Sequence, residues 1–194
     1  MESLYESWAK RNPSWERRYQ STVVDVFCDY GKGVSSFLEA RGKIFGAGYE
    51  IFIIAFFIGL YHNRTKPLIE ARDKKKVFGQ AIQYWGNIEN RIGRTSYGNI
   101  RRYIFAALIA RTDIDFIALD KGEITLRTVV DKMMEKMEEY ANYGFDYIED
   151  KLANDPNYYF SDVAFLTEIT NMLVASKTTE SDNDLDDELP ESLD

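Results

Sequence analysis

Paired cysteines and a leader segment are both missing from this sequence. Cys28 is the single cysteine among 194 residues, so no disulfide can form within the chain. Secreted folds of this size usually carry cysteine pairs. The first residues also lack the basic and apolar regions of a signal peptide. We therefore expect a soluble protein of the cytoplasm.

Apolar runs long enough to cross a bilayer are missing as well. The run from Ile51 to Tyr61 covers 11 residues, whereas a helix that spans a membrane needs about 20. Glu50 precedes the run, and polar residues from His62 to Arg64 follow it. We expect this run to form a central helix that is buried on nearly all sides, and we expect no membrane partner.

The residue types of most catalytic and metal sites are sparse. His62 is the only histidine, and with Cys28 it offers no set of ligands at zinc-binding spacing. Three aspartates lie close together, but they lack the glycine and the terminal glutamate of a calcium loop. We expect no catalytic residue, no metal and no cofactor. An enzyme would depend on an unrecognised group such as Asp113, Asp115 and Asp120.

Apolar residues make up 45% of the chain and aromatic residues 14%, enough to bury a core. Their spacing is mostly helical, which predicts an all-α, bundle-like single domain of about six or seven helices over residues 1–176. Ser14 and Asp73 are expected N-caps, the latter of a helix with three lysines on its first turn. A short strand or a helical turn is expected at 114–119. The other predicted helices cover 2–10, 34–41, 49–63, 99–111, 126–152 and 162–176.

The last 18 residues, 177–194, hold eight acidic residues and one basic residue, with almost no apolar content. Such a segment cannot bury enough surface to offset the entropy of ordering, so it is predicted to be a disordered acidic tail. It is either a solvated end of the chain or a functional segment. In the second case it competes with nucleic acid for the basic segment of the chain, or it docks on a basic partner.

Charge is segregated along the domain. Residues 61–111 hold eleven basic and three acidic side chains, whereas residues 112–176 hold five basic and fourteen acidic ones. Basic side chains neutralise phosphates, and interleaved tyrosines could stack on bases. We expect a non-enzymatic, nucleic-acid-associated accessory subunit with partner proteins. The predicted phosphate contacts are Arg64, Lys66, Lys74, Lys75, Lys76, Arg91, Arg94, Arg101 and Arg102.

Two alternatives remain open at this point. The basic segment could pair with the acidic segment across a helix interface, which would remove the basis of nucleic-acid binding. The protein could instead be an adaptor, in which the acidic helix 126–152 and the acidic tail bind a basic partner. That helix is predicted to bury one apolar stripe and to expose its acidic face to water.

The stretch Arg41 to Leu68 reads RGKIFGAGYEIFIIAFFIGLYHNRTKPL. Its basic lead-in, turn and compact apolar helix resemble the helix of DndE-type proteins, small helical accessory proteins of bacterial DNA sulfur-modification systems. The resemblance covers less than a sixth of the chain. It implies a role at DNA, in a modification or defence system, that uses the basic residues after the helix: Arg64, Lys66 and Lys74 to Lys76.

Overall fold

The computed structural model describes residues 2–28, 44–88, 95–161 and 163–183. The chain is 63% helical, with seven α-helices and one two-stranded sheet among the described residues. A mostly helical chain is therefore confirmed, and a bundle-like arrangement stays a prediction. The predicted helix 34–41 lies outside the described residues.

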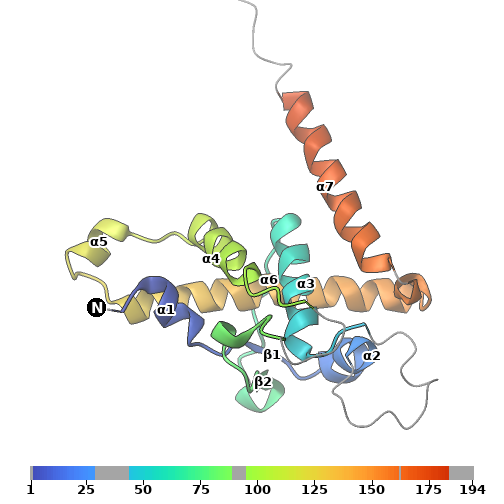
Figure 1. Ribbon diagram of the computed structural model, residues 1–194, viewed down its shortest axis with the longest axis horizontal. Helices are drawn as coiled ribbons and strands as arrows, with labels where there is room; N and C mark the ends of the chain where they lie inside the picture. Colours follow the sequence, from blue (N-terminus) through green and yellow to red (C-terminus); the bar gives the residue numbers. More distant parts are fainter. Residues whose placement is uncertain (1, 29–43, 89–94, 162, 184–194) are drawn as a thin grey trace, which may run out of the picture.

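The core is built where helix α3 (Gly48–Tyr61) crosses helix α6 (Leu126–Asn154). Figure 1 shows α6 as a long rod through the molecule, with α3 crossing it. Both helices were predicted, and α3 buries Ile51, Phe52 and Phe56 completely. Among the described residues, no helix is long and apolar enough to cross a membrane.

Two glycines let these helices touch through their backbones. A Cβ atom on Gly144 would lie 1.9 Å from the carbonyl oxygen of Ala55. A Cβ atom on Gly59 would lie 2.1 Å from the carbonyl oxygen of Tyr140. Real Cβ atoms do not approach backbone oxygens so closely, so α3 and α6 can pack in this way only with glycine at both positions.

The beginning of α3 is fixed by a buried carboxylate. Oε2 of Glu50 accepts hydrogen bonds from the amides of Gly46, at 2.6 Å, and Ala47, at 3.2 Å. Its Oε1 accepts a bond of 2.5 Å from the Tyr97 hydroxyl. These bonds satisfy amides that precede the helix and tie them to the segment before α4.

The N-terminal segment differs from its prediction. Helix α1 (Leu4–Ala9) begins at a capping box formed by Ser3 and Glu6. Ser14 does not cap a second helix: it opens strand β1 (Ser14–Glu16), because its amide donates to the Glu138 carboxylate of α6 at 2.7 Å. A π-helical turn, η1 (Gln20–Val24), and a short helix, α2 (Asp25–Phe27), follow.

The helix predicted to begin at Asp73 is also absent. A 3₁₀ turn, η2 (Arg72–Lys74), leads into strand β2 (Lys75–Val77), which pairs antiparallel with β1. Three cations on the first turn of a helix oppose its dipole, and pairing with β1 gives this backbone its hydrogen bonds without that cost. The all-α prediction therefore needs one small sheet added.

The remaining elements follow their predictions closely. Helix α4 (Ile100–Arg111) is confirmed, and the ambiguous segment at 114–119 contains a short helix, α5 (Phe116–Asp120). Thr125 caps α6 as expected, accepting from the Thr128 amide at 3.1 Å. A 3₁₀ turn, η3 (Ile82–Tyr84), lies between β2 and α4, and a second, η4 (Tyr158–Phe160), lies between α6 and the last helix.

The last helix is longer than predicted. Helix α7 (Ala164–Asn183) continues beyond residue 176, where the acidic tail was expected to begin. Figure 1 shows α7 projecting away from the rest of the chain. Residues 184–194 of the predicted tail lie outside the described residues.

Candidate nucleic-acid interface

Three of the residues predicted to contact phosphates lie together at the sheet, beside two further cations. Lys74 ends η2, and Lys75 and Lys76 belong to β2. Arg17, which follows β1, donates from its amide to the Lys74 carbonyl at 2.8 Å and from Nε to the Lys75 carbonyl at 2.9 Å. With the exposed Arg72, these residues form what we call the basic ribbon.

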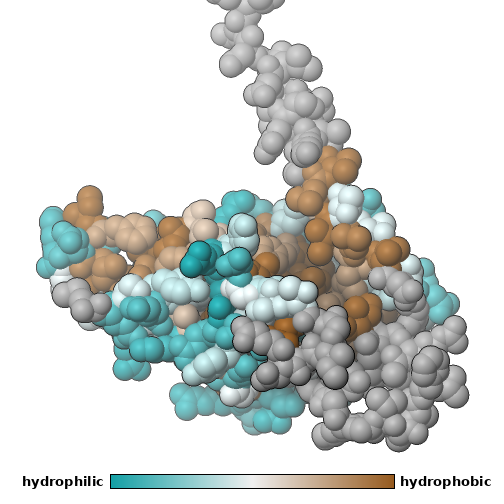
Figure 2. Space-filling view, viewed as in Figure 1, coloured by the Kyte–Doolittle hydropathy of each residue, from teal (hydrophilic) through white to brown (hydrophobic). Residues whose placement is uncertain are grey.

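The charges of the basic ribbon are directed mainly to solvent. Arg17, Arg72, Lys74 and Lys76 are exposed, and Lys75 is half-buried. The Lys76 ammonium bonds to the neutral Gln20 Oε1 at 2.6 Å. None of the five cations forms an ion pair with another described residue. The surface over β2, at the bottom of Figure 2, is hydrophilic.

An aromatic ring lies under the ribbon. Trp15 of β1 is opposite Lys76 in the register of the sheet, and the Lys76 ammonium is 5.6 Å from the ring centroid. Trp15 is only 4% exposed, so its ring supports the lysine from below and cannot stack on a base. The ribbon therefore offers charge, and its geometry suits phosphates better than bases.

A half-buried carboxylate, Glu138, faces the ribbon from α6. Burial raises the pKa of Glu138 to about 6, although the Ser14 amide and the nearby Lys75 favour its charged form. Since the folded pKa exceeds the ordinary value of 4.5, this group stabilises the fold below pH 4.5. That contribution is lost as the pH rises through 6.

We expect Glu138→Gln to stabilise the protein at pH 7 by roughly 1 to 2 kcal/mol, because the amide carries no charge to desolvate. The gain should vanish near pH 4.5, where the wild-type acid is protonated. Chemical unfolding at both pH values measures it, with the exposed Glu135→Gln on the same helix as control. A less stable variant at pH 7 would show that the charged bond to Ser14 dominates.

The predicted contacts after α3 do not join the ribbon. Asn63 ends the helix in a left-handed conformation, with φ 49°, which asparagine tolerates well. Arg64, the next residue, is exposed. The Lys66 ammonium, in contrast, pairs with Asp146 of α6. The Lys66 amide also donates to the Glu139 carbonyl at 3.0 Å. Lys66 therefore holds the loop to α6.

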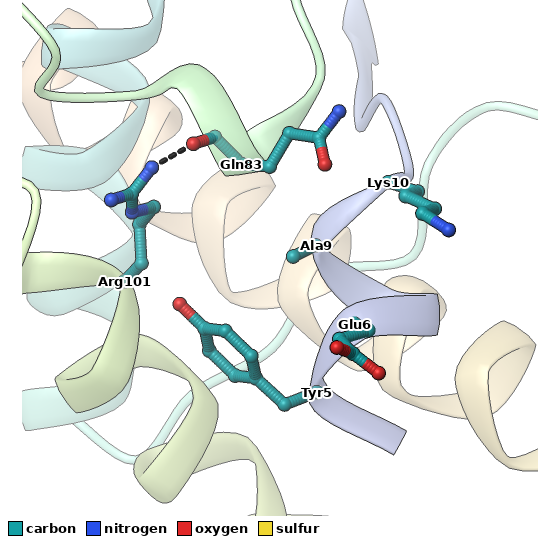
Figure 3. A pocket seen from close by; sticks show the side chains of 6 residues that line it. All are labelled: Tyr5, Glu6, Ala9, Lys10, Gln83 and Arg101. Carbon is teal, nitrogen blue, oxygen red and sulfur yellow. Dashed lines mark hydrogen bonds between the residues drawn. The ribbon is translucent and has the colours of Figure 1, made fainter. Parts of the chain in front are cut away.

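Arg101 lines a pocket of about 320 Å³ between α1, η3 and α4. Figure 3 shows its guanidinium directed at Gln83, with Glu6 of α1 and Lys10, which follows α1, on the opposite side of the pocket. Its Nε donates to the Gly98 carbonyl at 2.9 Å and its Nη1 to the Gln83 carbonyl. These bonds use much of its donor capacity internally, whereas Arg102 on the same helix is exposed.

The nine predicted contacts therefore occupy several places. In Figure 1, β2 lies below α6 and α4 lies above it. Lys74, Lys75 and Lys76 are brought together, and the remaining described ones are not. Arg91 and Arg94 lie outside the described residues.

The acidic face of α6 is less exposed than predicted. Asp131 pairs with Arg11 at 2.6 Å, and Glu149 pairs with Arg18 at 3.0 Å. Asp146 accepts from Lys66, Arg18 and the buried Tyr19 hydroxyl. The expectation of one solvent-exposed acidic face holds for Asp131 and Glu135. It fails for Glu138, Glu139, Asp146 and Glu149, which are half-buried.

Arg18 is the residue that the sequence analysis missed. It bridges Glu16, at 2.7 Å, Asp146 and Glu149, and its guanidinium also lies 4.0 Å from the Tyr19 ring. Glu16 in turn accepts from the Ile69 amide and from the Asn142 side chain. This polar cluster joins β1, α6 and the loop after α3. No local pattern around Arg18 indicates this cluster, because Asp146 and Glu149 come from a distant part of the chain.

Asp113 and Asp115 line one pocket together with Lys132, whereas Cys28 and His62 are not brought together. Cys28 contacts Ala47 at the start of α3, whereas His62 caps its end, and 14 residues of helix, about 21 Å, lie between. Asp115 caps α5 by accepting from the Ala118 amide at 2.8 Å. Within the part of the chain that the structure describes, no group of three or more potential ligands could hold a metal ion.

Comparisons with family models, with curated proteins and with solved structures found no match for this chain. The resemblance to DndE-type proteins therefore stays a prediction.

Proposed function

We propose that this protein is a non-enzymatic, cytoplasmic accessory subunit that binds the phosphates of nucleic acid through the basic ribbon. One observation carries the proposal: among the described residues, none of the five ribbon cations forms an ion pair with a carboxylate of α6. Among the described cations of residues 61–111, Lys66 alone forms an ion pair with α6. Four of the five ribbon cations are exposed, in or directly beside one small sheet.

Contact through the ribbon is expected to be largely independent of base sequence. Lysine ammonium groups meet phosphates as point charges, and Trp15 is too buried to read or stack on a base. The ribbon includes Arg17 and Arg72 in addition to Lys74, Lys75 and Lys76. It leaves Lys66 and Arg101 with structural roles, and Arg64 and Arg102 as separate exposed charges.

Replacing Lys74, Lys75 and Lys76 together by alanine should weaken binding to a DNA duplex at least about tenfold at low salt. It should also reduce the slope of log K against log salt by about 3, because each lost phosphate contact removes about one unit. Fluorescence anisotropy across a salt series measures both effects on the full chain.

The matched control removes three exposed cations elsewhere: Lys121, Arg127 and Lys132. It changes the net charge equally, so it separates a local site from the general field of the protein. An equal loss in both variants would contradict a ribbon site. Absence of wild-type binding at low salt would overturn the proposal as a whole.

A further inference from the structure

Helix α7 has two apolar sides, and only one of them faces the molecule. On the inner side, Phe165 stacks on Tyr159 with ring centroids 4.5 Å apart and meets Phe27 edge-on at 5.1 Å. Glu168 accepts hydrogen bonds from the hydroxyls of Tyr147 and Tyr158, and Met172 is also buried. These contacts fix the first turns of α7 against α6 and η4.

The outer side of α7 is apolar as well. Val163, whose carbonyl accepts from the Thr167 amide at 2.8 Å, lies on the first turn and is 53% exposed. Leu166 is 65% exposed, Leu173 57% and Val174 60%. Figure 2 shows hydrophobic surface over the first turns of the projecting helix. A helix that is apolar on both sides is normally covered on both.

The spacing of the outer side suits one partner helix. Val163, Leu166, Thr170 and Leu173 follow each other at intervals of three, four and three residues, which is the a/d spacing of a coiled-coil seam. The positions beside the seam are Thr167, Ile169 and Val174. Charged residues at such flanking positions ordinarily select a different partner chain, and here the described turns carry none.

We propose that this outer side pairs with α7 of a second copy of the chain, in antiparallel orientation. An uncharged seam is self-complementary, as a two-fold interface requires. Residues 177–194 carry a net charge of −7, so a parallel pair would bring two such segments together, and an antiparallel pair keeps them apart. In that orientation the a positions of one copy face the d positions of the other, so Leu166 faces Thr170 and Leu173 faces Val163.

The pair is expected to be reversible. A standard interface buries about 800 Å² on each partner, and one helix face with four large apolar side chains offers less. We expect the full chain to dissociate on the order of micromolar concentration. The mass by analytical ultracentrifugation should rise toward twice the 22.5 kDa of one chain as concentration increases.

Two double variants test the seam and its orientation. Val163→Glu with Leu173→Glu places like charges at facing positions in either orientation, so this variant should stay at 22.5 kDa at all concentrations. Val163→Glu with Leu173→Lys places opposite charges together only in the antiparallel pair, so it should still dimerise. Ile117→Glu on α5, at a position 69% exposed, is the control and should behave as wild type.

Circular dichroism should show the same helix content in all variants, because the altered side chains are exposed. A wild-type chain that stays monomeric at 100-fold the expected dissociation constant would overturn the proposal. Unchanged dimerisation of the doubly acidic variant would overturn the seam. A monomeric Glu/Lys variant would overturn the antiparallel orientation.

Discussion

Gly144→Ala should reduce the free energy of unfolding by at least about 3 kcal/mol. The added methyl group would lie 1.9 Å from the Ala55 oxygen and 2.5 Å from its carbonyl carbon, so α3 and α6 would have to separate. Overpacking of a core costs about 1 to 3 kcal/mol when flexible side chains yield, and here the obstacle is backbone. The gain in helix propensity, about 1 kcal/mol, recovers only part of this.

Thermal unfolding should show the loss as a decrease in Tm of roughly 6 to 12 °C. Gly79→Ala is the control, because nothing lies within 4 Å of a Cβ at that position, and it should change the free energy of unfolding by less than about 0.5 kcal/mol. Equal stability of Gly144→Ala and wild type would show that the helices cross at a greater distance than described.

Asp146→Ala should cost about 2 to 3 kcal/mol at pH 7. Its carboxylate accepts from Lys66, Arg18 and the Tyr19 hydroxyl, and Tyr19 is fully buried. Removing one member of this half-buried charged cluster leaves the Tyr19 hydroxyl and the Lys66 ammonium without their acceptor. The cost is kept moderate because Arg18 retains Glu16 and Glu149 as partners.

The same variant should show a defined dependence on pH. Although burial opposes it, bonds from Lys66, Tyr19 and Arg18 hold the pKa of Asp146 below its ordinary value of 3.8. The stability it contributes is therefore present above pH 3.8 and is lost as the pH falls through the lower folded value. Unfolding curves of variant and wild type should converge in acid. Asp150→Ala, at an exposed position one turn later, should match wild type throughout.

The long helices could be predicted from the sequence because their signals are local. The apolar run of α3, the period of α4 and the Thr125 cap of α6 each lie within the element that they define. The sheet could not be predicted in this way. Its strands have three residues each and pair Ser14 with Val77, so neither strand carries a recognisable pattern alone.

The candidate site was predicted only in part, because composition is a local signal and the contacts between distant segments are not. The basic composition of residues 61–111 identified Lys74 to Lys76, and the pairing of β2 with β1 added Arg17. Composition could not show that Lys66 is tied to α6 or that Arg101 folds back on the Gln83 carbonyl. Nor could it reveal that Arg11 and Arg18, from a segment of balanced charge, cover the acidic helix.

The crossing of α3 and α6 also determines when the core can fold during synthesis on the ribosome. Helix α3 ends at Tyr61, but its partner is complete only at Asn154. At about 5 to 20 residues per second, synthesis of the intervening stretch takes on the order of 5 to 20 s. During that time a strongly apolar helix lacks α6, the helix that it crosses in the core. Nascent chains should therefore engage hydrophobic-binding chaperones at α3 and release them once α6 has emerged.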